Sequence, residues 1–123
     1  MKEIGLRHTS ELTVTDSVTA IAMGSGDMPV LAPPAMMALM ENAAMLAIAE
    51  ALPEEYTSVG GHITSSHLRP SKIGDKVTAI AEVTKFDGKK VEFKVAAYSG
   101  DTLLGEGTHL RFIVDRARFL SKI

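Results

Sequence analysis

The sequence has no cysteine among its 123 residues. Disulfides, thiolate nucleophiles and cysteine-ligated zinc are therefore excluded. The absence also fits a reducing compartment. Residues 1–7 contain no long apolar core of the kind that marks a signal peptide. We therefore expect a cytoplasmic protein.

An excess of charge of either sign is also missing. The chain has 13 Lys and Arg against 15 Asp and Glu, a formal net charge of −2, and no basic cluster. Nucleic-acid binding is disfavoured because it needs phosphate-neutralising cations gathered on one face. The apolar stretch 35–49 is shorter than the roughly 20 residues of a membrane span and is broken by Glu41 and Asn42. No membrane association is expected.

Several familiar kinds of catalytic site are absent as well. The chain has no His-x-x-x-His pair, and His62 and His67 have an odd spacing that would turn them to opposite faces of a strand. A metal site is therefore not expected. There is no G-x-S-x-G elbow, and Gly24-Ser25-Gly26 lacks the rest of a dinucleotide fingerprint.

The length favours one domain, 1–123, and the apolar periodicity predicts its elements. A helix is expected from Pro34 to Leu52, because Pro33 and Pro34 precede an apolar run that Leu52-Pro53 ends. Alternating apolar residues predict the strands, turn residues predict the loop and the hairpin, and Asp115 as an N-cap predicts a short final helix. The expected segments are strands at 6–15, 60–68, 76–86, 91–98 and 103–114, a loop at 23–34, a hairpin turn at Asp87-Gly88 and a short helix at 116–122.

This order predicts an α+β fold in which a meander of four antiparallel strands follows the helix. Gly105 and Gly107 in the last strand indicate a bulge or the close approach of another backbone. The helix is apolar on nearly every side, which is typical of a buried helix. The sheet must therefore curl around it, or a second subunit must help to cover it.

Glu41 is the most informative residue, because it lies in the middle of that apolar helix. A buried acid must be paired, protonated or in use. It is interpreted either as a structural partner of a buried arginine or backbone group, or as a catalytic carboxylate.

Other candidates lie in the strands. His67 is either a strand histidine with a satisfied hydrogen bond or an acid–base group. Gly60 and Gly61 form either a tight turn or a pair of N–H donors for an oxyanion. Arg111 is either a solvated strand arginine or part of a site. Five methionines are either core packing or a flexible acyl pocket: Met28, Met36, Met37, Met40 and Met45.

Taken together, these motifs resemble the hotdog-fold thioesterases and, within them, the fluoroacetyl-CoA thioesterase subgroup. The resemblance covers nearly the whole chain. Its carriers are Pro34-Ala35-Met36, Leu39-Met40-Glu41, Ala43-Ala44, Ser58-Val59-Gly60, His67-Leu68-Arg69-Pro70, Ile73-Gly74, Asp87-Gly88-Lys89-Lys90, Gly105-Glu106-Gly107-Thr108-His109 and Arg111-Phe112.

The resemblance implies an antiparallel sheet of about five strands wrapped around one long central helix. It also implies a homodimer, possibly a tetramer, that hydrolyses a short-chain acyl-CoA at sites between subunits. Glu41 matches the family's helix glutamate and His67 its strand histidine. Gly60 matches a glycine that lines the acyl pocket, and Arg111 an arginine of the same site. No cofactor is expected, because coenzyme A enters only as part of the substrate.

Pro33 departs from the family pattern, because it stands where the family has a hydroxyl residue. Proline has neither a hydroxyl nor a backbone donor, and no Ser or Thr lies between Leu31 and Glu41. A covalent route through that hydroxyl is closed. We therefore expect water activated by Glu41 and His67, with the thioester oxygen held by Gly60 or Gly61 and the helix start near Ala35.

Two alternatives stay open at this point. Pro33 also favours a non-catalytic module that binds an acyl-CoA or another small ligand. A hotdog hydratase acting on enoyl-CoA is the other alternative, although such enzymes usually carry an Asp and a His close together in one segment, which this chain lacks.

Overall fold

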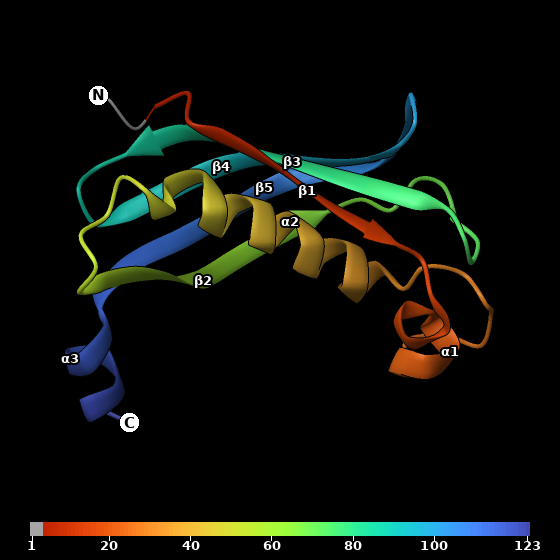
Figure 1. Ribbon diagram of the computed structural model, residues 1–123, viewed down its shortest axis with the longest axis horizontal. Helices are drawn as coiled ribbons and strands as arrows, with labels where there is room; N and C mark the ends of the chain where they lie inside the picture. The colour runs from red at the N-terminus through yellow and green to blue at the C-terminus, as the bar shows by residue number, and fades with distance from the viewer. Residues whose placement is uncertain (1–3) are drawn as a thin grey trace.

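The computed structural model describes residues 4–123 and shows five strands on one side of a long helix (Figure 1). The strands are β1 (Arg7–Thr13), β2 (Tyr56–Ser65), β3 (Lys76–Phe86), β4 (Lys90–Ser99) and β5 (Thr102–Asp115). The helices are η1 (Asp16–Val18), α1 (Ala20–Met23), α2 (Pro33–Ala49) and α3 (Arg116–Ser121). The predicted α+β fold, with one long helix packed on a five-stranded antiparallel sheet, is confirmed.

The sheet order is β1-β3-β4-β5-β2, with every neighbouring pair antiparallel. The predicted meander is correct for β3, β4 and β5 but wrong for β2. This strand pairs with β5 at the far edge, so the chain crosses from one side of the sheet to the other between β2 and β3. Gly60-Gly61 begins no strand either, because β2 already starts at Tyr56 and ends at Ser65, before His67.

The β3–β4 hairpin follows the sequence closely. Val77, Ala79, Ala81 and Val83 on β3, and Val91, Phe93, Val95 and Ala97 on β4, are all buried and alternate with exposed or half-buried residues. The turn places Gly88 at φ 95°, and the Asp87 carboxylate accepts hydrogen bonds from the Lys89 and Lys90 N–H groups. These bonds lower the pKa of Asp87.

Helix α2 is covered on one side only. Its buried residues follow a spacing of three and four: Ala35, Met36, Leu39, Met40, Ala43, Ala44 and Ile48. The opposite face, which includes Ala38, Glu41, Asn42 and Leu46, is exposed or half-buried. The curled sheet packs on one side of the helix and leaves this face open. The prediction that Glu41 is buried is wrong, since 41% of its side chain is exposed.

The segments before and after α2 close its N-terminal end. The predicted loop 23–34 is preceded by η1 and α1, which the sequence did not indicate, and Leu31 pairs with Thr19 in an isolated bridge. Residues 66–75 pass the same end of the helix, since the Leu31 N–H donates to the Ser71 carbonyl at 2.8 Å. No helix within residues 4–123 is long and apolar enough to cross a membrane.

Glycines in β5 allow the β2 backbone to approach closely. A Cβ on Gly107 would collide with the Thr64 carbonyl and would lie 2.9 Å from the Ser65 Cα. A Cβ on Gly105 would meet the Ser66 carbonyl and Met36. The prediction of a close approach is confirmed. A bulge also lies next to Gly105, because Ala97 pairs with Gly105 and Tyr98 with Leu103, which leaves Leu104 as the extra residue. A second register shift lies in β2, between Gly60 and His62.

We predict that Gly107→Ala lowers the free energy of unfolding by about 2 kcal/mol, because the ladder must shift to admit the methyl group. Urea denaturation followed by circular dichroism measures the change. Thr108→Ala is the control, because Thr108 is exposed and its hydroxyl bonds only Thr64 at the surface. A loss of less than about 0.5 kcal/mol is expected there, and equal losses in both variants would contradict the prediction.

Candidate functional site

The inward face of β5 carries two buried polar residues, His109 and Arg111, which are 2% and 6% exposed. They share a face because they are two residues apart on a strand. A buried guanidinium is costly unless its donors are satisfied. The surroundings of Arg111 therefore define the site.

Three neighbours hold Arg111. Its Nε donates to the Ser58 hydroxyl at 2.8 Å and its Nη2 to the Ser58 carbonyl at 2.9 Å. Its Nη1 lies 3.2 Å from His109 Nε2 and 4.0 Å from the Glu41 carboxylate. Burial lowers the pKa of Arg111, and Glu41 acts in the opposite direction. The predicted solvated strand arginine is wrong, and the guanidinium acts as a fixed positive charge beneath Glu41.

His109 has one tautomer that fits its neighbours. Arginine is only a donor, so His109 Nε2 must accept from Arg111 Nη1. Nδ1 then carries the proton and donates to the His62 carbonyl at 2.8 Å. Burial lowers the pKa of His109, and Arg111 lowers it further. The ring is therefore a neutral part of the cluster.

Gly60 brings β2 against this cluster. A Cβ at Gly60 would lie 2.8 Å from Glu41 Oε2, 3.4 Å from His109 Cε1 and 3.7 Å from Arg111 Nη1. A methyl group here would push the Glu41 carboxylate aside, so the Gly60 backbone borders the carboxylate directly. The structure thus brings together Glu41, Gly60 and Arg111, three of the residues that the sequence singled out.

Gly61 faces elsewhere. The register of β2 on β5 shifts between Gly60 and His62, and a Cβ at Gly61 would collide with the Phe112 ring. Gly61 is thus the extra residue of a bulge, and its side-chain position points away from Glu41. The role of its N–H group toward a thioester stays a prediction.

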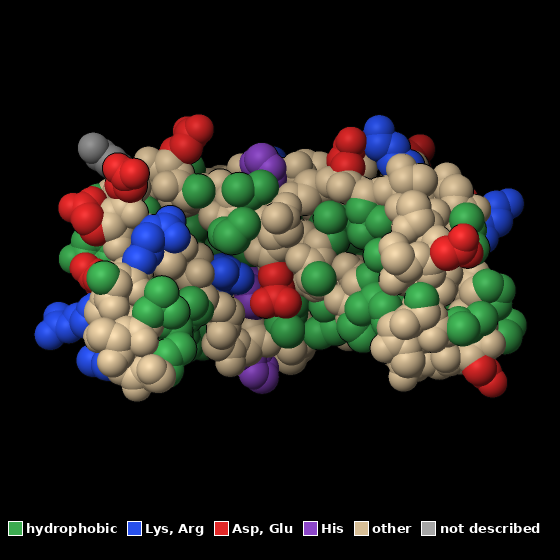
Figure 2. All heavy atoms as spheres, turned by 60° about the horizontal axis from the view of Figure 1, so that its bottom comes forward, with side chains coloured by type: hydrophobic (Ala, Val, Ile, Leu, Met, Phe, Trp, Pro, Cys, Tyr) green, Lys and Arg blue, Asp and Glu red, His purple; other side chains and the backbone are tan. Residues whose placement is uncertain are grey.

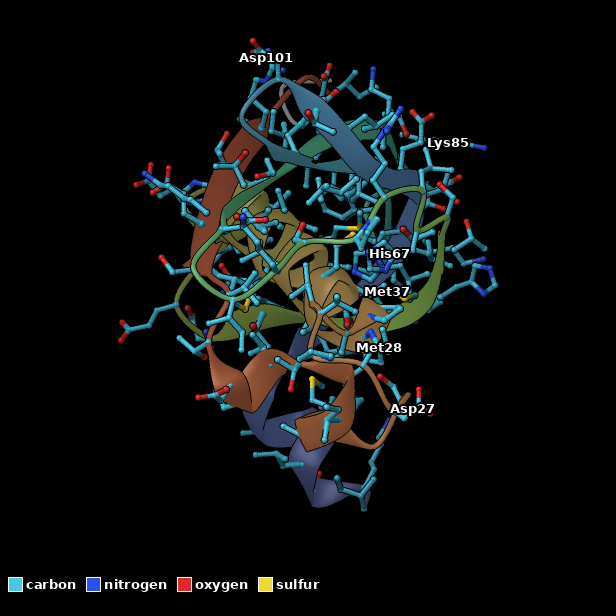
Figure 3. The ribbon with its side chains drawn as sticks, turned by 90° about the vertical axis from the view of Figure 1, so that its right-hand side faces the viewer. Asp27, Met28, Met37, His67, Lys85 and Asp101 are labelled. Carbon is cyan, nitrogen blue, oxygen red and sulfur yellow. The ribbon has the colours of Figure 1, made fainter. Side chains whose placement is uncertain are left out.

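His67 and Pro33 lie together in a second place. They share a pocket of about 320 Å³ at the N-terminal end of α2, lined by Val30, Leu31, Pro33, His67, Leu68, Arg69 and Pro70. Hydrogen bonds from Ser66 N to the Glu106 carbonyl (3.0 Å) and from Leu68 N to the Leu104 carbonyl (2.6 Å) hold the segment beside β5. Figure 3 views this end of the molecule and labels His67 together with Met28 and Met37.

The His67 ring has an unused nitrogen. Its Nε2 is buried and has no hydrogen-bond partner among residues 4–123. The expectation of a satisfied strand histidine is therefore wrong, because His67 lies after β2 and one ring nitrogen has no acceptor or donor opposite it. His67 lines the pocket, although its unpartnered Nε2 is itself shielded from solvent in this chain.

One chain does not join His67 to Glu41. Pro33 and Glu41 are eight residues apart on α2, which corresponds to about 12 Å along the helix axis. No hydrogen bond or ion pair links Glu41 to His67 within residues 4–123. Figure 2 shows acidic, basic and histidine side chains gathered in the middle of this face, with hydrophobic patches on both sides of them.

The start of α2 lacks free donors. Pro33 and Pro34 have no N–H, and the Ala35 and Met36 N–H groups both donate to the Ala32 carbonyl, at 3.0 and 3.1 Å. The prediction that the helix start near Ala35 holds the thioester oxygen is therefore wrong, because two donors are missing and two are used. A carbonyl oxygen would need donors from another element, such as Gly60.

The methionines divide between the core and the surface. Met36 and Met40 are fully buried, Met37 and Met45 are half-buried, and Met28 is 60% exposed. Core packing therefore accounts for the first two. Met37 is left on the side of α2 that the sheet does not cover.

The sequence profile of the fluoroacetyl-CoA-specific thioesterase family matches residues 14–117. The chain belongs to this family. It is 32% identical over 88 residues to the fluoroacetyl-CoA thioesterase of Streptantibioticus cattleyicolor, an alignment that spans 72% of this chain and 63% of that protein.

Solved structures confirm the hotdog fold. The fluoroacetyl-CoA thioesterase FlK superimposes with a TM-score of 0.90 at 29% identity, covering 97% of this chain and 93% of that one. A thioesterase superfamily member of Thermus thermophilus gives 0.88 at 27% identity, covering 96% and 88%. A hot-dog-like protein of Thermanaerovibrio acidaminovorans gives 0.86 at 22% identity, covering 97% and 88%, which supports the fold alone.

Ser58 and His109 belong to the Arg111 cluster, but the sequence did not predict them as site residues. The spacing of His109 and Arg111 contained the signal, because alternation places both on the face that Gly105 and Gly107 turn toward β2 and α2. Ser58 gave no such signal. Its contact with Arg111 depends on the pairing of β2 with β5, which is distant in sequence.

Two buried serines provide a matched test of the cluster. Ser58 binds Arg111 through its hydroxyl, whereas the Ser71 hydroxyl is buried with no partner among the described residues. We predict that Ser58→Ala costs about 1–3 kcal/mol of unfolding free energy, while Ser71→Ala is neutral or stabilising. Chemical denaturation of both variants measures this. Equal costs, or a larger loss for Ser71→Ala, would contradict the prediction.

Proposed function

We propose that this protein hydrolyses a short-chain acyl-CoA thioester, with Glu41 and His67 as the groups that act on water and substrate. The observation that carries the proposal is the half-exposed Glu41 carboxylate, which lies over a buried arginine beside Gly60 in a chain of the fluoroacetyl-CoA-specific thioesterase family. Crystal structures of the fluoroacetyl-CoA thioesterase FlK share this fold, and one FlK variant was crystallised with acetyl-CoA. This chain spans under two-thirds of its curated relative, so activity and substrate are proposed here.

The chemistry rests on water because Pro33 offers no nucleophile. Glu41 accepts a proton from a water molecule as the water oxygen attacks the thioester carbon. The C–S bond then breaks, the coenzyme A thiolate takes up a proton through His67, and the acid is released. The Gly60 backbone would hold the carbonyl oxygen as negative charge develops on it.

A homodimer is part of the proposal, because one chain separates the two groups. Strand β2 is an edge strand of ten residues, Tyr56–Ser65, without a single Lys, Arg, Asp or Glu. Uncharged edges invite pairing with another strand. The opposite edge, β1, instead carries Arg7 and Glu11, which face Glu82 and Lys76 at 4.0 and 3.4 Å.

Two β2 edges related by a two-fold axis would pair antiparallel and bring the uncovered faces of two α2 helices together. The apolar residues left exposed on α2, such as Ala38 and Leu46, would then be covered. The Glu41 of one copy would approach the Pro33–His67 pocket of the other. The dimer thus supplies the second subunit that the apolar helix requires.

The enzymatic prediction concerns Glu41 and His67. We expect Glu41→Ala and His67→Ala each to lower kcat/KM on acetyl-, propionyl- or fluoroacetyl-CoA by about 10²–10⁴-fold, since each removes a proton-transfer group. Release of free thiol measures the rate. Glu50→Ala and His8→Ala are matched controls, because both residues are exposed and lie outside the two sites.

The outcomes separate this proposal from its alternative. Equal rates in wild type and both site variants would remove the proposed roles. A non-catalytic binding module is favoured by Pro33 and by the largely apolar pocket that it shares with His67. Tight binding of acyl-CoA by calorimetry without turnover across the panel would establish that module instead.

The assembly prediction concerns β2. We expect light scattering to give at least twice the 13.1 kDa chain mass for the wild type. His62→Glu combined with Thr64→Glu should give monomers, because like charges would face each other across the paired edges. Thr9→Glu, on the edge strand β1, is the control and should leave the mass unchanged. Dissociation by the control alone would place the interface at β1.

A further inference from the structure

His109 is a buried polar group that the proposed chemistry does not use. It is 2% exposed, and it lies between the β2 backbone and Arg111. It also stacks on Phe93 of β4, with ring centroids 5.9 Å apart. A residue that needs only to fill this space could be apolar, like its neighbours on β4. The polar ring therefore calls for a reason.

The reason lies in the donors of Arg111. Arg111 Nε donates to the Ser58 hydroxyl and Nη2 donates to the Ser58 carbonyl, which fixes one side of the guanidinium. Nη1 is left with two neighbours, His109 Nε2 at 3.2 Å and Glu41 Oε2 at 4.0 Å. Of these two described neighbours, only His109 Nε2 lies within hydrogen-bonding distance of Nη1. It therefore determines how Nη1 is turned toward Glu41.

The backbone determines which nitrogen of His109 is free to accept. The His62 carbonyl can only accept, so it holds the proton on Nδ1 and leaves the lone pair on Nε2. The link runs from the β2 backbone through the ring and Arg111 to the carboxylate on α2. Hydrogen bonds join the first three members, and an ion pair at 4.0 Å joins Arg111 to Glu41.

We propose that His109 is a positioning residue for Glu41, acting through Arg111. The ring does not touch the substrate pocket. It holds the guanidinium, and the guanidinium holds the carboxylate beside Gly60. This inference deepens the proposed function and, as a statement about catalysis, rests on it.

Two substitutions separate packing from hydrogen bonding. His109→Phe keeps a ring against Phe93 but has no acceptor for Arg111, whereas His109→Gln offers Oε1 as an acceptor near the position of Nε2. We expect His109→Phe to lower kcat on the best acyl-CoA substrate about 30-fold with KM changed less than about threefold, because a misplaced group costs rate more than binding. His109→Gln should stay within about fivefold of wild type.

A purely structural role would not give this pattern. Circular dichroism and denaturation confirm that each variant is folded before rates are compared. A folded His109→Phe variant with wild-type kcat would overturn the inference, as would a His109→Gln variant no better than His109→Phe. Nitrogen NMR of the wild type tests the tautomer directly, and a proton found on Nε2 would overturn the inference even if His109→Phe failed to fold.

The inference and the proposed function can fail separately. A wild type without turnover on any acyl-CoA would end the thioesterase proposal. The link itself is then decided by carboxyl-carbon NMR of Glu41 in wild type and His109→Gln or His109→Phe. A titration midpoint of Glu41 that differs between wild type and His109→Phe, and returns with His109→Gln, supports the link. Identical titrations in all three would overturn it.

Discussion

The buried guanidinium of Arg111 is the charge around which the candidate site is arranged. Removing a guanidinium from water is expensive unless its donors are matched, and Ser58, His109 and Glu41 match them from three elements, β2, β5 and α2. Because the partners come from distant parts of the chain, the ion pair can form only in the folded sheet. The same charge determines where the one acid of α2 lies, which links the fold to the chemistry.

The helix and the sheet explain why the site is open on one side. A five-stranded sheet covers only about half of α2, so the residues at and around Glu41 stay accessible while Met36 and Met40 are fully buried. An acid on a completely enclosed helix could not meet a substrate. An acid on the uncovered face can, and in the proposed dimer the apolar residues next to it form the wall of a cleft between subunits.

Local patterns could be predicted from the sequence, and long-range pairings could not. The alternation of Val77 to Val83 and of Val91 to Ala97, together with Asp87-Gly88, predicted β3, β4 and their turn, because these signals arise within a few residues. The position of β2 was missed because Gly60-Gly61 is typical of a turn, whereas the glycines serve a bulge and a close approach of side chains. Glu41 and Arg111 were singled out, but their contact depends on how α2 packs on the folded sheet, chiefly against β1 and β3, which periodicity does not encode.

Pro33 changes the chemistry more than the fold. The helix begins normally there, since proline suits its first position, and the pocket it lines with His67 is intact. The helix start has no free hydrogen-bonding group. Pro33 has no hydroxyl, Pro33 and Pro34 have no N–H, and the N–H groups of the next two residues donate to the Ala32 carbonyl. The helix dipole can still favour negative charge there, but no donor is left to define its position. In the proposed mechanism, catalysis is therefore directed from the other end of the cleft between subunits, by the Gly60 backbone and by a carboxylate that Arg111 holds in place.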